Sequence, residues 1–277
     1  MSVSLTLAVL IIPLILTADD ELEEAKARIA AARAYYVKAA AQFEFKFDEK
    51  DEEPLKFEKS PVMRWSNEDW TGDLFVWTRH GRPEVIGCLF SGPPRRNLRS
   101  ISQEFHLLSE KPLAPVLMPS GARWAPKEGL KLRVIKDFEA PADTPVLRLA
   151  QMRKAVRDFS AHMTELDNSL MDLRSLPQPL VRYQPDEGPV VDGALFTFVS
   201  TVGTDPELIL LLECRKTKEG LRWFYAPVRF TNREVWLKHS NIEVWRDAMH
   251  NLETGAVSTS IYMLRHLETI PDPPPNK

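Results

Sequence analysis

Cysteine is scarce in this chain, which contains only Cys88 and Cys214 among 277 residues. Two cysteines are too few for the cross-linked framework of a small disulfide-rich domain. Each follows a Pro-Glu pair: Cys88 lies four residues after Glu84, and Cys214 lies seven residues after Glu207. Because side chains alternate between the two faces of a strand, an even and an odd spacing place the two cysteines on opposite faces of their segments. We therefore expect two buried thiols and no disulfide, with a bridge between them as the alternative.

Glycine and histidine are also few, with 11 and 6 residues. The sequence contains no Gly-rich phosphate loop, no dinucleotide fingerprint, no G-x-S-x-G elbow and no H-E-x-x-H motif. Its histidines lack the spacing of metal ligands. We therefore expect no metal site and no cofactor.

Neither sign of charge dominates, because 36 Lys and Arg residues face 39 Asp and Glu residues and the net charge is −3. A nucleic-acid-binding protein needs a basic surface to bind phosphates, and no long basic run is present. Nucleic acid is therefore not an expected partner. The 44% hydrophobic content is enough for a chain of this length to bury a core.

Long apolar runs are absent except at the N-terminus, where residues 5–16 read LTLAVLIIPLIL. A short uncharged run, then a small residue, Ala18, and an acidic one, Asp19, form the outline of a secretory signal. We expect a signal peptide over 1–18, cleavage between Ala18 and Asp19, and export to the periplasm or cell envelope. An uncleaved, membrane-tethered N-terminus is the alternative, because no basic residue precedes the run. A helix needs about 20 consecutive apolar residues to span a bilayer, and no other segment has a run of that length. We therefore expect no transmembrane span in the mature chain.

Two stretches of the chain resemble each other, TGDLFVWTRHGRPEVIGCLF at 71–90 and DGALFTFVSTVGTDPELILLL at 192–212. A second matching pair, PVMRW at 61–65 and PLVRY at 179–183, precedes them in the same order. Insertions between the matches fall in expected loops, where they are tolerated. The similarity therefore indicates an internal repeat of hairpin strands.

A helical pattern precedes each set of strands. Residues 20–42 are acidic in the first turn and rich in alanine afterwards. Residues 145–166 follow Thr144 as a candidate N-cap, begin with Pro145 and carry apolar residues at spacings of 3 and 4. These patterns predict an α+β fold of two tandem helix-plus-antiparallel-sheet repeats, 19–143 and 144–270, packed as a pseudo-symmetric pair, with a disordered Pro-rich tail at 271–277.

The strand at 208–212, Leu-Ile-Leu-Leu-Leu, does not alternate between apolar and polar residues. A strand with one face in water would alternate, so we expect both faces of its sheet to be covered. One helix can cover only one of these faces, which favours close packing of the two halves.

The chain also resembles an uncharacterised family of predicted secreted proteins from planctomycete bacteria. The stretches that carry this resemblance run through most of residues 61–230: MRW at 63–65, GRPE at 81–84, QEFHLLSE at 103–110, QMRKAVRDF at 151–159, LPQPLVRY at 176–183, DGALFTFV at 192–199 and TDPE at 204–207. The resemblance implies a bacterial, exported setting. It implies no activity, ligand or catalytic residue.

Three polar residues, Ser102, Glu104 and His106, stand at alternate positions and would project from one face of a strand. A hydroxyl, a carboxylate and an imidazole together could perform acid–base or nucleophilic chemistry. Neighbours on one face of a strand are roughly 7 Å apart, too far for a direct Ser–His hydrogen bond. The favoured interpretation is therefore the solvent face of an edge strand, with a catalytic group as the alternative.

Tryptophan is frequent, with seven residues, and four of them have no counterpart in the repeat: Trp70, Trp124, Trp236 and Trp245. If these side chains line a groove, they could stack on sugar rings or on a peptide. Arg64 and Arg182 occupy matched positions, and we expect them to form structural ion pairs with acids such as Glu84 and Glu207 or, alternatively, to flank a shared groove.

The leading hypothesis is an exported, non-catalytic cell-envelope protein that binds an unknown protein or polysaccharide partner. The alternative is an envelope hydrolase that uses His106 and Glu104. The first requires an exposed apolar or aromatic surface, and the second requires His106 in a pocket beside another functional group.

Overall fold

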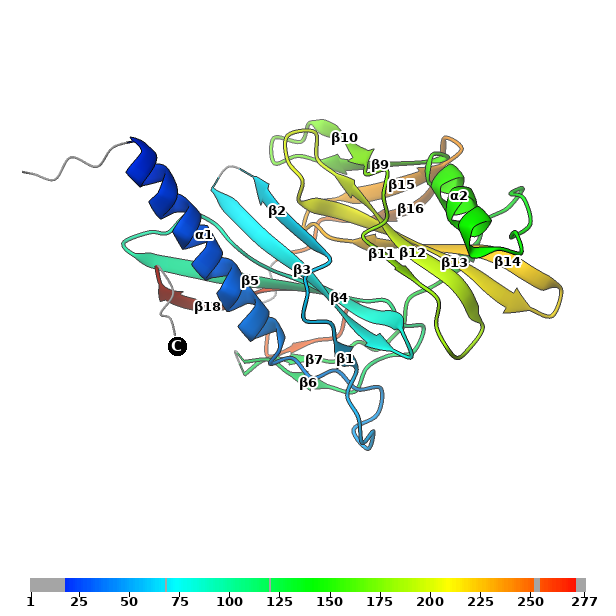
Figure 1. The fold of residues 1–277 in the computed structure, drawn as a ribbon, viewed down its shortest axis with the longest axis horizontal. Helices are drawn as coiled ribbons and strands as arrows, with labels where there is room; N and C mark the ends of the chain where they lie inside the picture. Colours follow the sequence, from blue (N-terminus) through cyan, green and yellow to red (C-terminus); the bar gives the residue numbers. More distant parts are fainter. Residues whose placement is uncertain (1–17, 68, 120, 252–254, 273–277) are drawn as a thin grey trace, which may run out of the picture.

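The structure of the protein is a computed structural model that describes residues 18–67, 69–119, 121–251 and 255–272. Strands hold 46% of the residues and helices 13%, and the described part contains two large curled antiparallel sheets and two helices (Figure 1). The predicted α+β class of two helix-plus-sheet repeats is therefore wrong, and the fold is β-rich. Several strands are only two residues long, too short to produce a period-2 pattern in the sequence.

The first sheet has the strand order β1-β3-β4-β5-β18, with β2 paired to β3. Its strands are β1 (Lys56–Phe57), β2 (Met63–Asn67), β3 (Trp70–Arg79), β4 (Arg82–Ser91), β5 (Leu98–Leu107) and β18 (Tyr262–Pro271). The two-residue turn between β3 and β4 consists of His80 and Gly81, both with positive φ (50° and 79°). Two left-handed residues match the twist of a tight hairpin, so the hairpin predicted over 71–90 is confirmed.

The second sheet has the order β16-β15-β9-β10-β12-β13-β14-β8, with β11 paired to β12. Its strands are β8 (Arg133–Val134), β9 (Phe159–Thr164), β10 (Leu170–Ser175), β11 (Val181–Tyr183), β12 (Val190–Val199), β13 (Pro206–Thr217), β14 (Gly220–Arg229), β15 (Val235–His239) and β16 (Ile242–Asp247). A third, small sheet joins β6 (Val116–Leu117), β7 (Arg123–Trp124) and β17 (Val257–Ser258).

Each large sheet carries one helix on its outer face. Helix α1 (Ala18–Ala40) packs on the first sheet, where Tyr36 and its neighbours share a core with Phe75, Trp77 and Phe105. Helix α2 (Pro145–Val156) packs on the second sheet and covers β12 and β13 (Figure 1). Neither helix of the described residues has the length and apolar character that a bilayer crossing requires.

The inner faces of the two large sheets pack on each other. One hydrophobic cluster, which we call the inter-sheet core, contains Leu74, Val76 and Ile86 of the first sheet together with Ile209 and Leu211 of the second. The alternate residues of β13 face the core beneath α2 instead. All five residues at 208–212 are fully buried, so the prediction that both faces of this strand are covered is confirmed.

The two sheets do not coincide with the predicted segments 19–143 and 144–270. Strand β18, at the end of the chain, pairs with β5 in the first sheet, and β8 pairs with β14 in the second. Each sheet thus takes one strand from the other half of the chain. Two residues of the predicted tail at 271–277 belong to the described structure: Pro271 ends β18, and the Asp272 carboxylate accepts a hydrogen bond from Arg99 at 2.7 Å. The rest of the predicted tail and the predicted signal residues 1–17 lie outside the described residues.

The start of α2 is as predicted, and its end is not. The Thr144 hydroxyl accepts a hydrogen bond from the Leu147 amide, and Pro145 occupies the first turn. The helix ends at Val156, and the second half of the predicted helix is strand β9. In β9 the residues Phe159, Ala161 and Met163 alternate inward, and this strand pairs with β10 and β15. Pairing with β10, the next strand in the chain, and with the more distant β15 therefore overrides the local helical spacing.

The two thiols lie in different cores. Cys88 belongs to the inter-sheet core and Cys214 to the core beneath α2, and both are buried thiols that form no disulfide.

Candidate functional site

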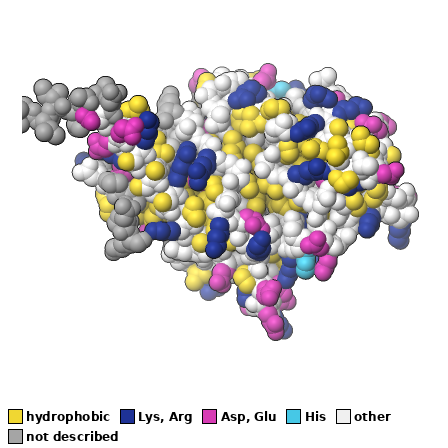
Figure 2. All heavy atoms as spheres, in the orientation of Figure 1, with side chains coloured by type: hydrophobic (Ala, Val, Ile, Leu, Met, Phe, Trp, Pro, Cys, Tyr) yellow, Lys and Arg dark blue, Asp and Glu magenta, His cyan; other side chains and the backbone are white. Residues whose placement is uncertain are grey.

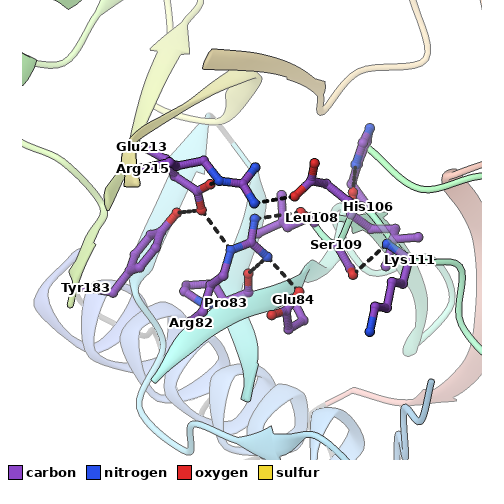
Figure 3. Close-up of polar contacts among 12 residues, drawn as sticks. Arg82, Pro83, Glu84, His106, Leu108, Ser109, Lys111, Tyr183, Glu213 and Arg215 are labelled. Atoms are coloured by element: carbon purple, nitrogen blue, oxygen red, sulfur yellow. Dashed lines mark hydrogen bonds and ion pairs between the residues drawn. The ribbon is translucent and has the colours of Figure 1, made fainter. Parts of the chain in front are cut away.

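Buried charged side chains lie at both ends of the inter-sheet core. At one end, which we call the Arg82 cluster, Arg82 at the start of β4 reaches between Glu213 of β13 and Glu84 of its own strand (Figure 3). Arg82 Nε lies 2.7 Å from Glu213 and Arg82 Nη1 lies 2.6 Å from Glu84. The Tyr183 hydroxyl donates a further hydrogen bond of 2.8 Å to Glu213.

The Arg82 cluster is a structural element, because each of its buried carboxylates has a cationic partner. Burial lowers the pKa of Arg82, but the charges of Glu213, Tyr183 and Glu84 outweigh it and raise this pKa above its ordinary value. Arg82 also donates to the Leu108 carbonyl at 3.1 Å. Because the hydrogen bonds of Arg82 are used within the protein, this cation offers little to a ligand. Its bond to Glu213 instead links the first sheet to the second at this end of the core.

The other end of the core opens into a cavity of about 310 Å³, which we call the acidic pocket. Glu104 of β5 lines it from the first sheet, and Asp205 and Glu207, at the start of β13, line it from the second. Glu104 is 7% exposed and Glu207 is 9% exposed. The pocket therefore brings together three carboxyl groups on segments about 100 residues apart in the chain.

Aromatic side chains form one side of the acidic pocket. Phe90 lies between Trp65 and Trp70, with ring centroids 6.1 Å and 6.2 Å from theirs. Trp65 is fixed by a hydrogen bond from its Nε1 to Cys88 Sγ at 3.4 Å. Trp70 lies over Gly92, where a Cβ atom would come within 2.9 Å of its ring, and it is 46% exposed. An indole ring is thus available at the edge of the pocket.

Glu104 is oriented by a hydrogen bond from a neighbouring strand. The Tyr262 hydroxyl of β18 donates to Glu104 Oε1 at 2.5 Å. Burial raises the pKa of Glu104 to about 7, although the Tyr262 hydrogen bond and the charge of Arg229 oppose this rise. Near neutral pH this carboxyl therefore exchanges readily between its two protonation states.

Glu207 is held in its protonated form. Burial raises the pKa of Glu207 to about 8, and the charges of Asp205 and Glu104 add to this effect. A hydrogen bond with Thr231 and the charge of Arg233 only partly oppose it. Burial also raises the pKa of Asp205. A neutral carboxyl that can donate a proton therefore lines the same pocket as one that can accept a proton, a combination typical of acid–base sites.

His106 lies in a different cavity, of about 450 Å³, together with Arg133, Trp245, Asp247 and Tyr262. Its Nδ1 is 2.8 Å from the Leu107 carbonyl, and burial lowers its pKa to about 4. The imidazole is therefore neutral at pH 7, with Nδ1–H as donor to that carbonyl. Tyr262 lines this cavity and binds Glu104 of the acidic pocket, so it stands between the two sites.

The structure separates the three polar residues of β5 that the sequence grouped. Glu104 lines the acidic pocket, His106 lines the second cavity, and Ser102 lines a third beside Trp70. The favoured interpretation as the solvent face of an edge strand is wrong, because Glu104 and His106 are buried and β5 lies between β4 and β18. The face that they share is covered by the second sheet.

The four tryptophans without a repeat counterpart do not form one groove. Trp70 is at the acidic pocket and Trp245 at the His106 cavity. Trp124 is fully buried beneath α1 and donates to the Ser260 carbonyl at 2.8 Å, so it is a core residue. Trp236 is buried. Its ring stacks on His162 of β9, and the guanidinium carbon of Arg246 of β16 lies 4.3 Å from its centroid.

Arg64 and Arg182 form structural ion pairs, but with other acids than expected. Arg64 Nε is 3.4 Å from Asp73, and Arg182 Nη2 is 2.9 Å from Asp192. Both aspartates are fully buried. Of the acids expected as partners, Glu84 pairs with Arg82 and Glu207 lines the acidic pocket. Strand β2 pairs with β3 and β11 with β12, so each arginine meets the acid of its neighbouring strand.

The sequence interpretation missed Asp205 as a site residue and treated Glu207 only as an ion-pair partner. A signal was present, because Asp205 and Glu207 flank a proline at the start of a strand and alternate residues of a strand share a face. What the sequence could not show is that Glu104, on a distant strand, faces them.

Among the described residues, no group of three or more His, Cys, Asp or Glu side chains is arranged to hold a metal ion. Basic and acidic side chains are interspersed on the face seen in Figure 2, in keeping with the net charge of −3. Long-range attraction of a strongly charged ligand is therefore weak on this face.

Comparison of the chain with protein-family models, with curated proteins and with solved structures finds no match in any of the three.

Proposed function

We propose that this protein is an exported envelope protein that binds a saccharide chain in the acidic pocket. The observation that carries the proposal is the half-exposed Trp70 ring beside buried hydrogen-bonding groups in one cavity. A sugar ring has an apolar C–H face that stacks on an indole and hydroxyl groups that need donors and acceptors. The carboxyl groups of Glu104 and Glu207 can supply both.

The protonation of the pocket favours an uncharged ligand over a cation. A cation site keeps its carboxyl groups ionised, whereas Glu207, with a pKa of about 8, is mostly neutral at pH 7. Among the described residues that line the pocket, Arg233 supplies the one guanidinium, and it also pairs with Glu165 at 2.7 Å. A neutral, hydroxyl-rich ligand suits these groups best.

Binding is tested by titrating the protein calorimetrically with six neutral hexasaccharides: chitohexaose, cellohexaose, xylohexaose, mannohexaose, maltohexaose and laminarihexaose. We expect at least one to bind, and Trp70→Ala to weaken that binding about fivefold, since an aromatic stacking contact is worth about 1 kcal/mol. Trp70→Phe should lose less, because it keeps a ring.

The matched control is Trp245→Ala, which removes a tryptophan from the His106 cavity and should leave saccharide affinity unchanged. Absence of binding across the six saccharides, or equal affinity of Trp70→Ala and the unaltered protein, would contradict saccharide binding at this pocket.

Export rests on the signal-like residues 1–18 and is tested separately. We expect N-terminal sequencing of the protein from envelope fractions of its host to begin at Asp19. Recovery of intact Met1 in the cytoplasmic fraction would contradict export.

A further inference from the structure

Resting on the proposed saccharide binding, we infer that the acidic pocket hydrolyses the glycosidic bond of the bound chain, with Glu207 as general acid and Glu104 as general base. The two carboxyl groups come from opposite walls, Glu104 from β5 and Glu207 from β13, so a ligand in the cavity lies against both. Hydrolysis of a glycoside commonly needs this arrangement of one proton donor and one acceptor on two sides of the bond.

The surroundings of each carboxyl determine its role. Glu104 Oε1 accepts a hydrogen bond from the Tyr262 hydroxyl, and this bond favours the ionised form of Glu104, the form that can accept a proton from water. Glu207 lies beside Asp205, whose charge disfavours ionisation of its neighbour. Tyr262 is a positioning residue, because it orients Glu104 and acts through it.

The buried carboxyl groups at the opposite end of the same core show what a structural role looks like. Glu84 and Glu213 each lie within 2.7 Å of Arg82. In the described part of the chain no ion pair involves Glu104 or Glu207, and the nearest cationic influences on them are Arg229 and Arg233. Burying two carboxyl groups without an ion-pair partner is unfavourable for folding. A catalytic role toward a bound ligand explains why the protein keeps both groups in this cavity.

The reaction balances without a cofactor. The Glu207 carboxyl gives its proton to the bridging oxygen as the bond between that oxygen and the anomeric carbon breaks. A water molecule bonds to the anomeric carbon and loses a proton to Glu104 Oε2. One water is consumed and two shorter saccharides leave, after which Glu104 releases its proton to solvent and Glu207 takes one up.

Cleavage is tested by incubating the full chain with the same six hexasaccharides and separating the products chromatographically from pH 5 to pH 9. We expect shorter saccharides, with a rate that rises with pH through about 7 as Glu104 ionises and falls above about 8 as Glu207 loses its proton. The groups that influence the protonation of these two carboxyls are Asp205, Arg229, Arg233 and Tyr262.

Glu207→Gln should lower the rate at least 100-fold and abolish the fall at high pH, since a general acid contributes about 10²–10⁴. Its loss should be smaller for nitrophenyl glycosides, whose leaving group needs no proton. Glu104→Gln should also lower the rate at least 100-fold and abolish the rise near pH 7. The matched control is Glu84→Gln, an equally buried carboxyl outside the pocket, with folding of each variant verified by thermal denaturation.

Two results would overturn hydrolysis and leave saccharide binding intact: a saccharide that binds in the calorimeter but yields no shorter product at any pH, or cleavage that persists unchanged in Glu207→Gln. If none of the hexasaccharides binds, the proposed function fails and hydrolysis at this pocket fails with it.

Discussion

Replacement of Arg82 by methionine is expected to lower the free energy of unfolding by about 3–5 kcal/mol, the typical consequence of removing one partner from a buried ion pair. Glu213 is fully buried and would keep only the Tyr183 hydroxyl and Arg215, whose Nε is 3.7 Å away. Glu84 would lose its 2.6 Å contact as well. Chemical denaturation at pH 7 measures the loss.

The control is Arg222→Met, which removes an arginine of β14 that is 48% exposed and pairs only with Glu219, and which should change stability by less than about 1 kcal/mol. Combining Arg82→Met with Glu84→Gln and Glu213→Gln should recover much of the loss, because no unpaired charge then remains buried. If the triple variant is as unstable as Arg82→Met alone, lost packing and not uncompensated charge explains the effect.

Stability is expected to fall by about 2–3 kcal/mol between pH 6.5 and pH 8.5, and Glu207→Gln is expected to remove most of this fall. The folded-state pKa values of Glu207 and Glu104, about 8 and about 7, both exceed the ordinary value of 4.5. The native state therefore binds more protons than the unfolded state, so the stabilising contribution is complete below about pH 4.5 and is lost as pH rises through the folded pKa values. His106, whose pKa is lowered to about 4, changes charge only below this window.

Thermal or urea denaturation at several pH values measures this dependence. Glu207→Gln should be more stable than the unaltered protein at both pH values, and by a larger margin at pH 8.5 than at pH 6, whereas Glu219→Gln, at an exposed carboxyl, should show the unaltered profile. A flat profile for the unaltered protein would contradict the protonated state assigned to Glu207. Together with the activity test, this variant should separate stability from function, because the same substitution stabilises the fold and removes the proton donor.

Several local elements of this fold could be predicted because their signals are contained in a few neighbouring residues. Thr144 and Pro145 predict the start of α2, since a hydroxyl acceptor and a preset φ satisfy the first turn whatever the rest of the chain does. The Gly-containing turn at 80–81 predicts a tight hairpin for the same reason. The apolar run at 208–212 predicts a strand covered on both faces.

The fold class could not be predicted from the same signals. Residues 159–166 have apolar spacings that suit a helix, yet β9 forms because β10 and β15 supply strand partners on both sides. Strand β18 joins β5 across about 160 residues of chain, and no local pattern specifies such a pairing. Strand pairing depends on partners outside the strand's own stretch of sequence, which is why the helix content was overestimated.

The candidate site follows the same division. From the residues themselves came the scarcity of metal ligands, the signal-like N-terminus, and the choice of Glu104 and Trp70 as chemically interesting side chains. Only the tertiary structure shows that Glu207 and Glu104 line one pocket, that His106 lies in another cavity and that Trp124 is a core residue. The reason is physical: a residue type sets which proton or ring is available, whereas burial and the charges of non-local neighbours set its protonation state and its accessibility to a ligand.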